Sequence, residues 1–113
     1  MTTDKADKII ACIAAIPSGM VASYGQIAEL AGIARGHRVV AKFLKQDNSV
    51  DDLPWHRVIR SDGKLGFPIG SRMFLQQMTQ LKVEGVVAKN NRIDMKRYAW
   101  QPTLDFILFH PDL

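Results

Sequence analysis

A short run near the middle of the chain, Pro54-Trp55-His56-Arg57, concentrates side chains that can bind another molecule. Proline fixes the local backbone and disfavours a helix before it. His56 and Arg57 add a titratable ring and a permanent cation. Trp55 offers a wide apolar face, but its indole N–H is a donor only and is not a useful nucleophile. The residue types therefore favour binding over covalent chemistry at Trp55.

Basic side chains crowd into the sequence on both sides of this run. The chain of 113 residues has a formal net charge of +4 and a pI of about 9.5, which permits nucleic-acid binding without proving it. The distribution is more informative than the total, because many of the cations fall in one stretch. They are Arg35, His37, Arg38, Lys42, Lys45, Arg57, Arg60 and Lys64.

Length and composition predict one small domain with a modest core. Of the residues, 47% are hydrophobic and 23% are charged, as in ordinary globular proteins. No apolar run approaches the roughly 18 residues of a membrane helix, and the first residues lack a signal-peptide pattern, so we expect a cytoplasmic protein, nucleoid-associated if prokaryotic. The single cysteine, Cys12, excludes an intramolecular disulfide and is expected to be a buried apolar residue.

The first two helices are predicted from apolar spacing and from caps. Apolar residues at three- and four-residue steps predict a helix over residues 4–16, which Pro17-Ser18-Gly19 ends. Ser23 is a predicted N-cap, and Gln26 stands three residues later, as a capping box requires. The second helix then runs to Gly32, which closes it.

A third helix is predicted from Gly36 to Leu44, with Val40, Phe43 and Leu44 on its inner face. Two short helices joined by about four residues with a glycine form a helix-turn-helix pattern. Residues 45–53 are polar and acidic, and we expect a loop there.

The second half of the chain is predicted to hold a turn and one more clear helix. Asp-Gly at the centre of residues 61–64 indicates a turn, across which residues 58–59 and 65–67 could pair as a small hairpin. A helix over residues 70–84 ends at Gly85. These elements predict a mainly α, winged-helix-like helix-turn-helix domain with a small hairpin.

The end of the chain is less regular. Asn90-Asn91 indicates a turn, and residues 93–100 are ambiguous between helix and extended chain. We expect a single DNA-binding domain over residues 1–102 and an apolar tail over residues 103–113, which packs on the body or marks a contact surface.

Several positions together resemble the O6-alkylguanine-DNA alkyltransferases. The active-site signature of that family is Pro-Cys-His-Arg-Val, and residues 54–58 match it except that Trp55 replaces the alkyl-accepting cysteine. Ser23-Tyr24-Gly25-Gln26 and Glu84-Gly85 also match, and Arg38 lies 14 residues after Tyr24 and 17 before Trp55, as in the family. The chain from about residue 16 to residue 85 is therefore similar to the alkyltransferase-like proteins, which bind the damaged base without repairing it.

The resemblance implies roles in base flipping for two residues. Arg38 on the recognition helix would enter the minor groove and fill the space that the flipped base leaves. The alternative is a plain phosphate contact. Tyr24 would push on the phosphate of the target nucleotide, and its alternative is a core tyrosine with a satisfied hydroxyl.

The resemblance also implies a lesion pocket lined by Trp55, Val58 and Phe67, although Trp55 read alone could be a core residue. Residues 67–69, Phe-Pro-Ile, stand where alkyltransferases usually carry a tyrosine and a serine, so base recognition there must differ. His56, Arg57 and Glu84 would support the pocket. Candidate contacts to the DNA backbone are Arg35, Gly36, Lys42, Ser71 and Arg72.

The function expected from the resemblance is a non-enzymatic sensor that binds O6-alkylguanine in duplex DNA, flips it and flags it for nucleotide excision repair proteins such as UvrA. We expect a monomer that uses no cofactor or metal and binds no membrane. An enzyme is the second hypothesis, but the chain shows no obvious cluster for glycosylase or endonuclease chemistry. The third is a sequence-specific regulator that uses an ordinary helix-turn-helix.

Overall fold

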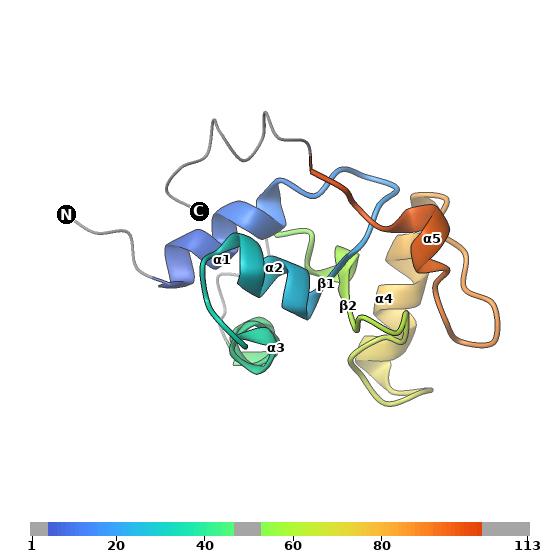
Figure 1. Cartoon of the computed structure of the whole chain (residues 1–113). Helices are drawn as coiled ribbons and strands as arrows, with labels where there is room; N and C mark the ends of the chain where they lie inside the picture. Colours follow the sequence, from blue (N-terminus) through green and yellow to red (C-terminus); the bar gives the residue numbers. More distant parts are fainter. Residues whose placement is uncertain (1–4, 47–52, 103–113) are drawn as a thin grey trace.

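Helices dominate the computed structural model, which describes residues 5–46 and 53–102 (Figure 1). The mainly helical class is confirmed. Within the described ranges, no helix combines the length and the apolar character that crossing a bilayer requires. The elements in chain order are α1 Lys5–Ala14, β1 Ala22–Ser23, α2 Tyr24–Leu30, α3 His37–Gln46, the 3₁₀ turn η2 Trp55–Arg57, β2 Val58–Ile59, α4 Arg72–Val83 and α5 Met95–Tyr98.

Helix α1 buries one face, as its apolar spacing predicts. Ile9 and Ile13 are at most 1% exposed, and Ile16 follows the helix into the core. Cys12 is fully buried, as expected, and burial raises the pKa of its thiol to about 11. The cysteine is therefore an uncharged core residue at neutral pH.

The predicted cap of α2 is confirmed, but only half of the capping box forms. The Ser23 hydroxyl accepts a hydrogen bond from the Gln26 backbone N–H at 3.0 Å. The Gln26 side chain does not return to Ser23; its amide donates instead to the Trp100 carbonyl at 2.9 Å. Gly32 follows the helix with a φ of +77°, a left-handed conformation that suits glycine. The hydrogen bond from Gln26 thus connects α2 to Trp100, 74 positions away in the chain.

The strands pair differently from the expected hairpin. Val58 and Ile59 form a parallel pair with Ala22 and Ser23, rather than an antiparallel pair with residues 65–67. The reason is burial: Val58 and Ile59 are at most 1% exposed, so they lie inside the domain, whereas a wing lies at its edge. The turn itself does form, since the Arg60 N–H donates to the Lys64 carbonyl at 2.9 Å.

This two-stranded sheet separates two apolar clusters. Successive residues of a strand point to opposite faces, so Val58 packs with α1, α2 and α3, and Ile59 packs with α4. In Figure 1 the β1–β2 pair stands between α1, α2 and α3 on one side and α4 and α5 on the other. The 3₁₀ turn immediately before β2 therefore sits at the junction of both halves.

The boundaries of α4 agree with the prediction. The Ser71 hydroxyl caps its start by accepting from the Phe74 N–H at 3.2 Å, and Glu84 and Gly85 follow its end. The predicted Asn90–Asn91 turn is present, with both residues at positive φ. Two expectations lie outside the described residues: the tail over 103–113 and most of the loop over 45–53, of which Lys45 belongs to α3.

Candidate nucleic-acid interface

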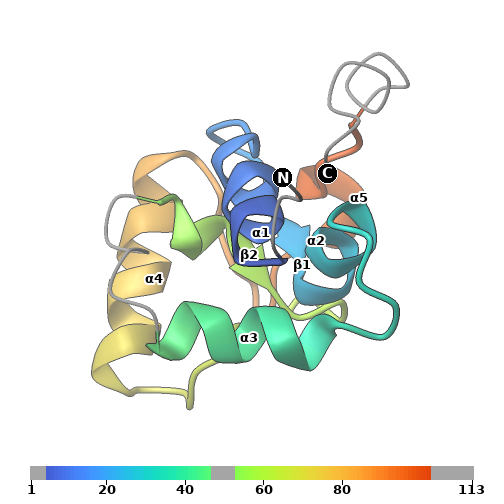
Figure 2. The same cartoon turned by 90° about the vertical axis from the view of Figure 1, so that its left-hand side faces the viewer.

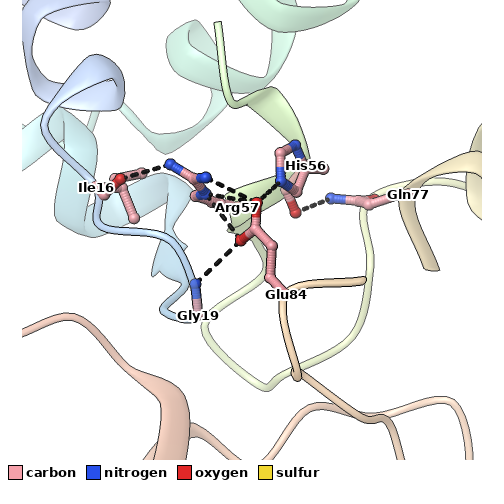
Figure 3. A network of polar contacts seen from close by, with 6 residues as sticks. All are labelled: Ile16, Gly19, His56, Arg57, Gln77 and Glu84. Atoms are coloured by element: carbon pink, nitrogen blue, oxygen red, sulfur yellow. Dashed lines mark hydrogen bonds and ion pairs between the residues drawn. The ribbon is translucent and has the colours of Figure 1, made fainter. Parts of the chain in front are cut away.

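A polar network centred on Glu84 fixes the 3₁₀ turn in place (Figure 3). The Glu84 carboxylate lies 2.7 Å from His56 Nε2 and accepts bonds of 2.7–3.2 Å from Nε and Nη2 of Arg57. It also accepts the backbone N–H of Gly19 at 3.1 Å. Arg57 donates in addition to the Ile16 carbonyl at 2.8 Å. The end of α4, the 3₁₀ turn and the loop after α1 are thus joined through one carboxylate.

The same network keeps Glu84 ionised. Burial alone would raise the pKa of this carboxyl group, but the hydrogen bonds from Arg57, His56 and Gly19 outweigh it and lower the pKa to about 2. The Arg57 side chain is 16% exposed and that of Glu84 12%, so their ion pair is largely shielded from water. At neutral pH Glu84 is therefore negatively charged and bound to both residues that follow Trp55 in the chain.

Gln77 of α4 holds the backbone of the turn from the other side. This side chain is fully buried, and its amide nitrogen donates to the carbonyls of His56 and Val58 at 3.0 and 3.1 Å. Its amide oxygen has no hydrogen-bond partner among the described residues. The sequence analysis missed this anchor. The available signal was a polar side chain on the inner face of a helix otherwise lined there by Phe74 and Leu81.

Two of the three predicted pocket residues lie together. Trp55 is half-buried and meets the ring of Phe67 edge to face, with centroids 6.0 Å apart and planes at 86°. Lys45 of α3 reaches the same place, with Nζ 5.3 Å from the Phe67 ring and 3.1 Å from the Gly66 carbonyl. Val58 differs, because its side chain is buried in the core at 1% exposure.

Tyr24 combines features of both interpretations that its sequence context allowed. It is 8% exposed and belongs to the core, and a Cβ added to Gly66 would collide with its hydroxyl, so this close approach requires glycine. It also lines an open cleft of about 360 Å³ with His37 and Arg60. Burial raises the pKa of Tyr24, and the nearby Arg60 charge opposes the rise. The hydroxyl is therefore neutral at pH 7, and Tyr24 shares the lining of the cleft with the Arg60 cation.

The outer face of α3 carries the predicted DNA-contacting cations. Arg38 and Lys42 are exposed on it, while Val40 is fully buried on the opposite face. Arg35 is also exposed, in the turn before the helix, with a φ of 53°. Gly36 is required there, because a Cβ would collide with Ile33.

The remaining backbone-contact candidates lie at the start of α4. Ser71 is half-buried and caps the helix, and Arg72 is exposed. Figure 2 shows α3 crossing the front of the molecule, with the loop into α4 close to its C-terminal end. The contact of Lys45 with Gly66 agrees with that view. One surface thus carries α3, the Trp55–Phe67 pair and the start of α4.

Comparison with known proteins places this surface in context. Residues 4–86 match the family model of the 6-O-methylguanine DNA methyltransferase, DNA binding domain. The chain is 38% identical to a DNA base-flipping protein of Vibrio parahaemolyticus over 96 residues, which cover 84% of this chain and 94% of that protein. It is 30% identical to alkyltransferase-like protein 1 of Schizosaccharomyces pombe over 100 residues, covering 84% and 93%.

A solved structure has the same fold. The crystal structure of Atl1 from Schizosaccharomyces pombe in complex with damaged DNA containing O6-carboxymethylguanine superposes with a TM-score of 0.79 at 30% identity. The match covers 90% of this chain and all of that one.

Proposed function

We propose that this protein binds alkylated guanine in duplex DNA and flips the damaged base out of the stack. The premise is its family: the chain belongs to the 6-O-methylguanine DNA methyltransferase DNA-binding family and to its alkyltransferase-like, base-flipping members. A modified O6 atom is hidden inside the duplex, and a protein can inspect it closely only when the base leaves the stack. Flipping costs a few kcal/mol, and less for a poorly paired, damaged base.

The exposed helix α3 supplies the groups that flipping needs. Arg38 projects from a helix whose other face is anchored by Val40, so a rigid element carries its flat cation. In this proposal Arg38 occupies the vacated place in the stack, and Tyr24, which lines the cleft with Arg60, meets the phosphate of the target nucleotide. Lys42 and Arg35 contact the backbone and set the register.

The flipped base enters the region beside Trp55 and Phe67. Their edge-to-face contact leaves aromatic surface that suits a purine and an alkyl group. Stacking on an aromatic side chain contributes about 1–3 kcal/mol per base. Phe67 has no hydrogen-bonding group, so recognition on this side rests on apolar contact.

The observation that carries the proposal is Trp55 itself, which precedes the His56 of an intact His56–Glu84 contact at the position where the alkyltransferases have cysteine. An indole N–H donates a hydrogen bond and does not accept an alkyl group. Cys12 is the single cysteine of the chain, and it is fully buried with a pKa raised to about 11. Binding without alkyl transfer follows, and the bound lesion is handed to nucleotide excision repair proteins such as UvrA.

The test uses two duplexes that differ by one methyl group, one with O6-methylguanine and one with guanine. Binding is measured by anisotropy, and the methyl content of the DNA is measured afterwards by mass spectrometry. We expect tighter binding to the methylated duplex and no loss of methyl. Equal affinity for both would contradict lesion recognition, and equal affinity with a strong sequence preference would favour a regulator. Methyl transfer to the protein would contradict the non-enzymatic proposal.

A further inference from the structure

A second group of cations lies where the loop between α4 and α5, with Lys89 and Arg92, meets the turn after β2, with Lys64. Arg92 forms isolated antiparallel bridges with both Lys64 and Lys89, and Ile93 N–H donates to the Gly63 carbonyl at 2.8 Å. The three cations border an open groove of about 520 Å³. Two isolated backbone bridges therefore bring three positively charged residues to one place.

The charge at this groove is only partly compensated. Side chains on directly opposite residues of an antiparallel pair lie about 5 Å apart at Cβ, where like charges repel. Asp62 and Asp94 are the nearby carboxylates and offset part of this charge, because Asp62 interacts electrostatically with Lys64 and Arg92 and Asp94 itself lines the groove. Asp62 pairs with Arg60 at 2.9 Å and accepts the Lys64 N–H, and Asp94 accepts the Lys96 N–H at the start of α5. An anion in the groove would relieve the remaining repulsion.

The groove continues the surface that carries α3. Arg60 and Lys64 are joined across their turn by a backbone hydrogen bond of 2.9 Å. Arg60 lines the cleft that holds Tyr24, whereas Lys64 lines the second groove, so one turn separates the two. In Figure 1, α3 and the turn after β2 lie on the lower side of the molecule, and the α4–α5 loop descends along the right-hand side to their level. A ligand as long as a duplex can meet all three.

We propose that Lys64, Lys89 and Arg92 bind phosphates of the DNA backbone outside the nucleotides that carry the lesion. The inference rests on the proposed function, because it extends the path of the same duplex across the molecule. Duplex DNA presents one charge for about every 1.7 Å of its axis, so an extended row of cations can meet several phosphates. Such contacts add affinity and fix orientation without reading sequence or damage.

The test compares two double variants that each remove two positive charges. Lys89→Ala with Arg92→Ala empties the loop of its cations, and Lys5→Ala with Lys8→Ala removes the same charge from α1 on the far side of the sheet. Alanine is a good helix former, so the control leaves α1 intact. Affinity is measured for methylated and unmodified duplexes of about 25 base pairs over a range of salt, and thermal melting confirms that both variants fold.

We expect the loop variant to bind both duplexes about tenfold more weakly and to reduce the salt slope by about 1.8, or 0.9 for each lost phosphate contact. The preference for the lesion stays unchanged, and the α1 variant behaves as the wild type. An equal effect of the two variants would overturn the inference, since net charge alone would explain it. Unchanged DNA binding by the loop variant would also overturn it and would leave the surface to an acidic protein partner.

The two proposals fail separately. Wild-type protein that binds methylated and unmodified duplexes equally would contradict the proposed function. The comparison of the two variants on unmodified duplex would still decide whether the loop cations contact phosphate. Loss of lesion preference in the loop variant would overturn the inference, because it would make the loop part of the recognition site.

Discussion

Replacing Glu84 by glutamine tests whether the polar network holds the two halves of the domain together. Glutamine keeps the size of the side chain but removes the charge that Arg57 and His56 contact. The Arg57 side chain, 16% exposed, then loses its counter-ion and keeps as acceptors the Ile16 carbonyl and a neutral amide oxygen. Removing one partner of a buried pair costs about 3–5 kcal/mol, and solvent at the rim of this network lowers our expectation to about 2 kcal/mol.

The same variant should change how stability depends on pH. The pKa of Glu84 is lowered from 4.5 to about 2 in the folded protein. Because the folded-state pKa is the lower one, this group stabilises the fold above about pH 4.5 and loses its contribution as the pH falls toward 2. A shift of that size corresponds to at most about 3 kcal/mol, less the screening by water. In Glu84→Gln this acid-sensitive contribution is absent.

Thermal and urea unfolding from pH 7 down to pH 2 measure both effects. At pH 7 a loss of about 2 kcal/mol lowers Tm by about 10 °C in a domain of this size. Glu29→Gln is the matched control, because it makes the same chemical change on the exposed face of α2. If Glu84→Gln melted like the control, or lost stability in parallel with the wild type between pH 4.5 and pH 2, the network would not have the role assigned to it.

Three further predictions concern lesion binding. Arg38→Ala should weaken binding to methylated duplex more than to unmodified duplex, whereas Lys42→Ala should weaken both equally. An equal loss of affinity for the two duplexes in Arg38→Ala would indicate a plain phosphate contact. Trp55→Ala should reduce the preference for the lesion by about 1–3 kcal/mol, measured as the ratio of two dissociation constants, and an unchanged ratio would exclude Trp55 from the pocket. Trp55→Cys should transfer methyl groups poorly, because a misplacement of the reacting atoms by about 1 Å can lower the rate a hundredfold and Phe67 cannot orient the guanine by hydrogen bonds. Rapid, stoichiometric labelling of the variant by radiolabelled DNA would refute this expectation.

The helices were predictable because their signals are local. Apolar spacing marks the buried face of α1, and the predicted cap at Ser23 depends on residues within one turn, as does the Ser71 cap of α4, which was not predicted. Glycine and paired asparagines mark chain reversals through their own backbone preferences. Such features need no knowledge of the rest of the chain, so one sequence suffices.

The strand pairing and the anchors of the turn were not predictable in this way. An Asp-Gly turn signals a reversal after Ile59, but it does not say that Val58 and Ile59 already pair with residues 36 positions earlier. The choice depends on which pairing buries both faces, which is a property of the whole fold. Gln77 and Lys45 donate hydrogen bonds to backbone carbonyls 19 and 21 positions away. Because every residue has a backbone carbonyl, the sequence does not indicate which one accepts.

The contact between His56 and Glu84 has a structural role that does not depend on a thiol. In an alkyltransferase such a pair activates cysteine, so its presence beside Trp55 could suggest a catalytic remnant. Here the Glu84 carboxylate also accepts bonds from Arg57 and Gly19, and it thereby joins three segments of the chain. Because removing Glu84 would leave the largely shielded Arg57 cation without its counter-ion, the carboxylate stabilises the fold whether or not a thiol is present. In the proposed function, Trp55 can therefore lie beside this network without disturbing it, and the network supports the aromatic surface that binds the flipped base.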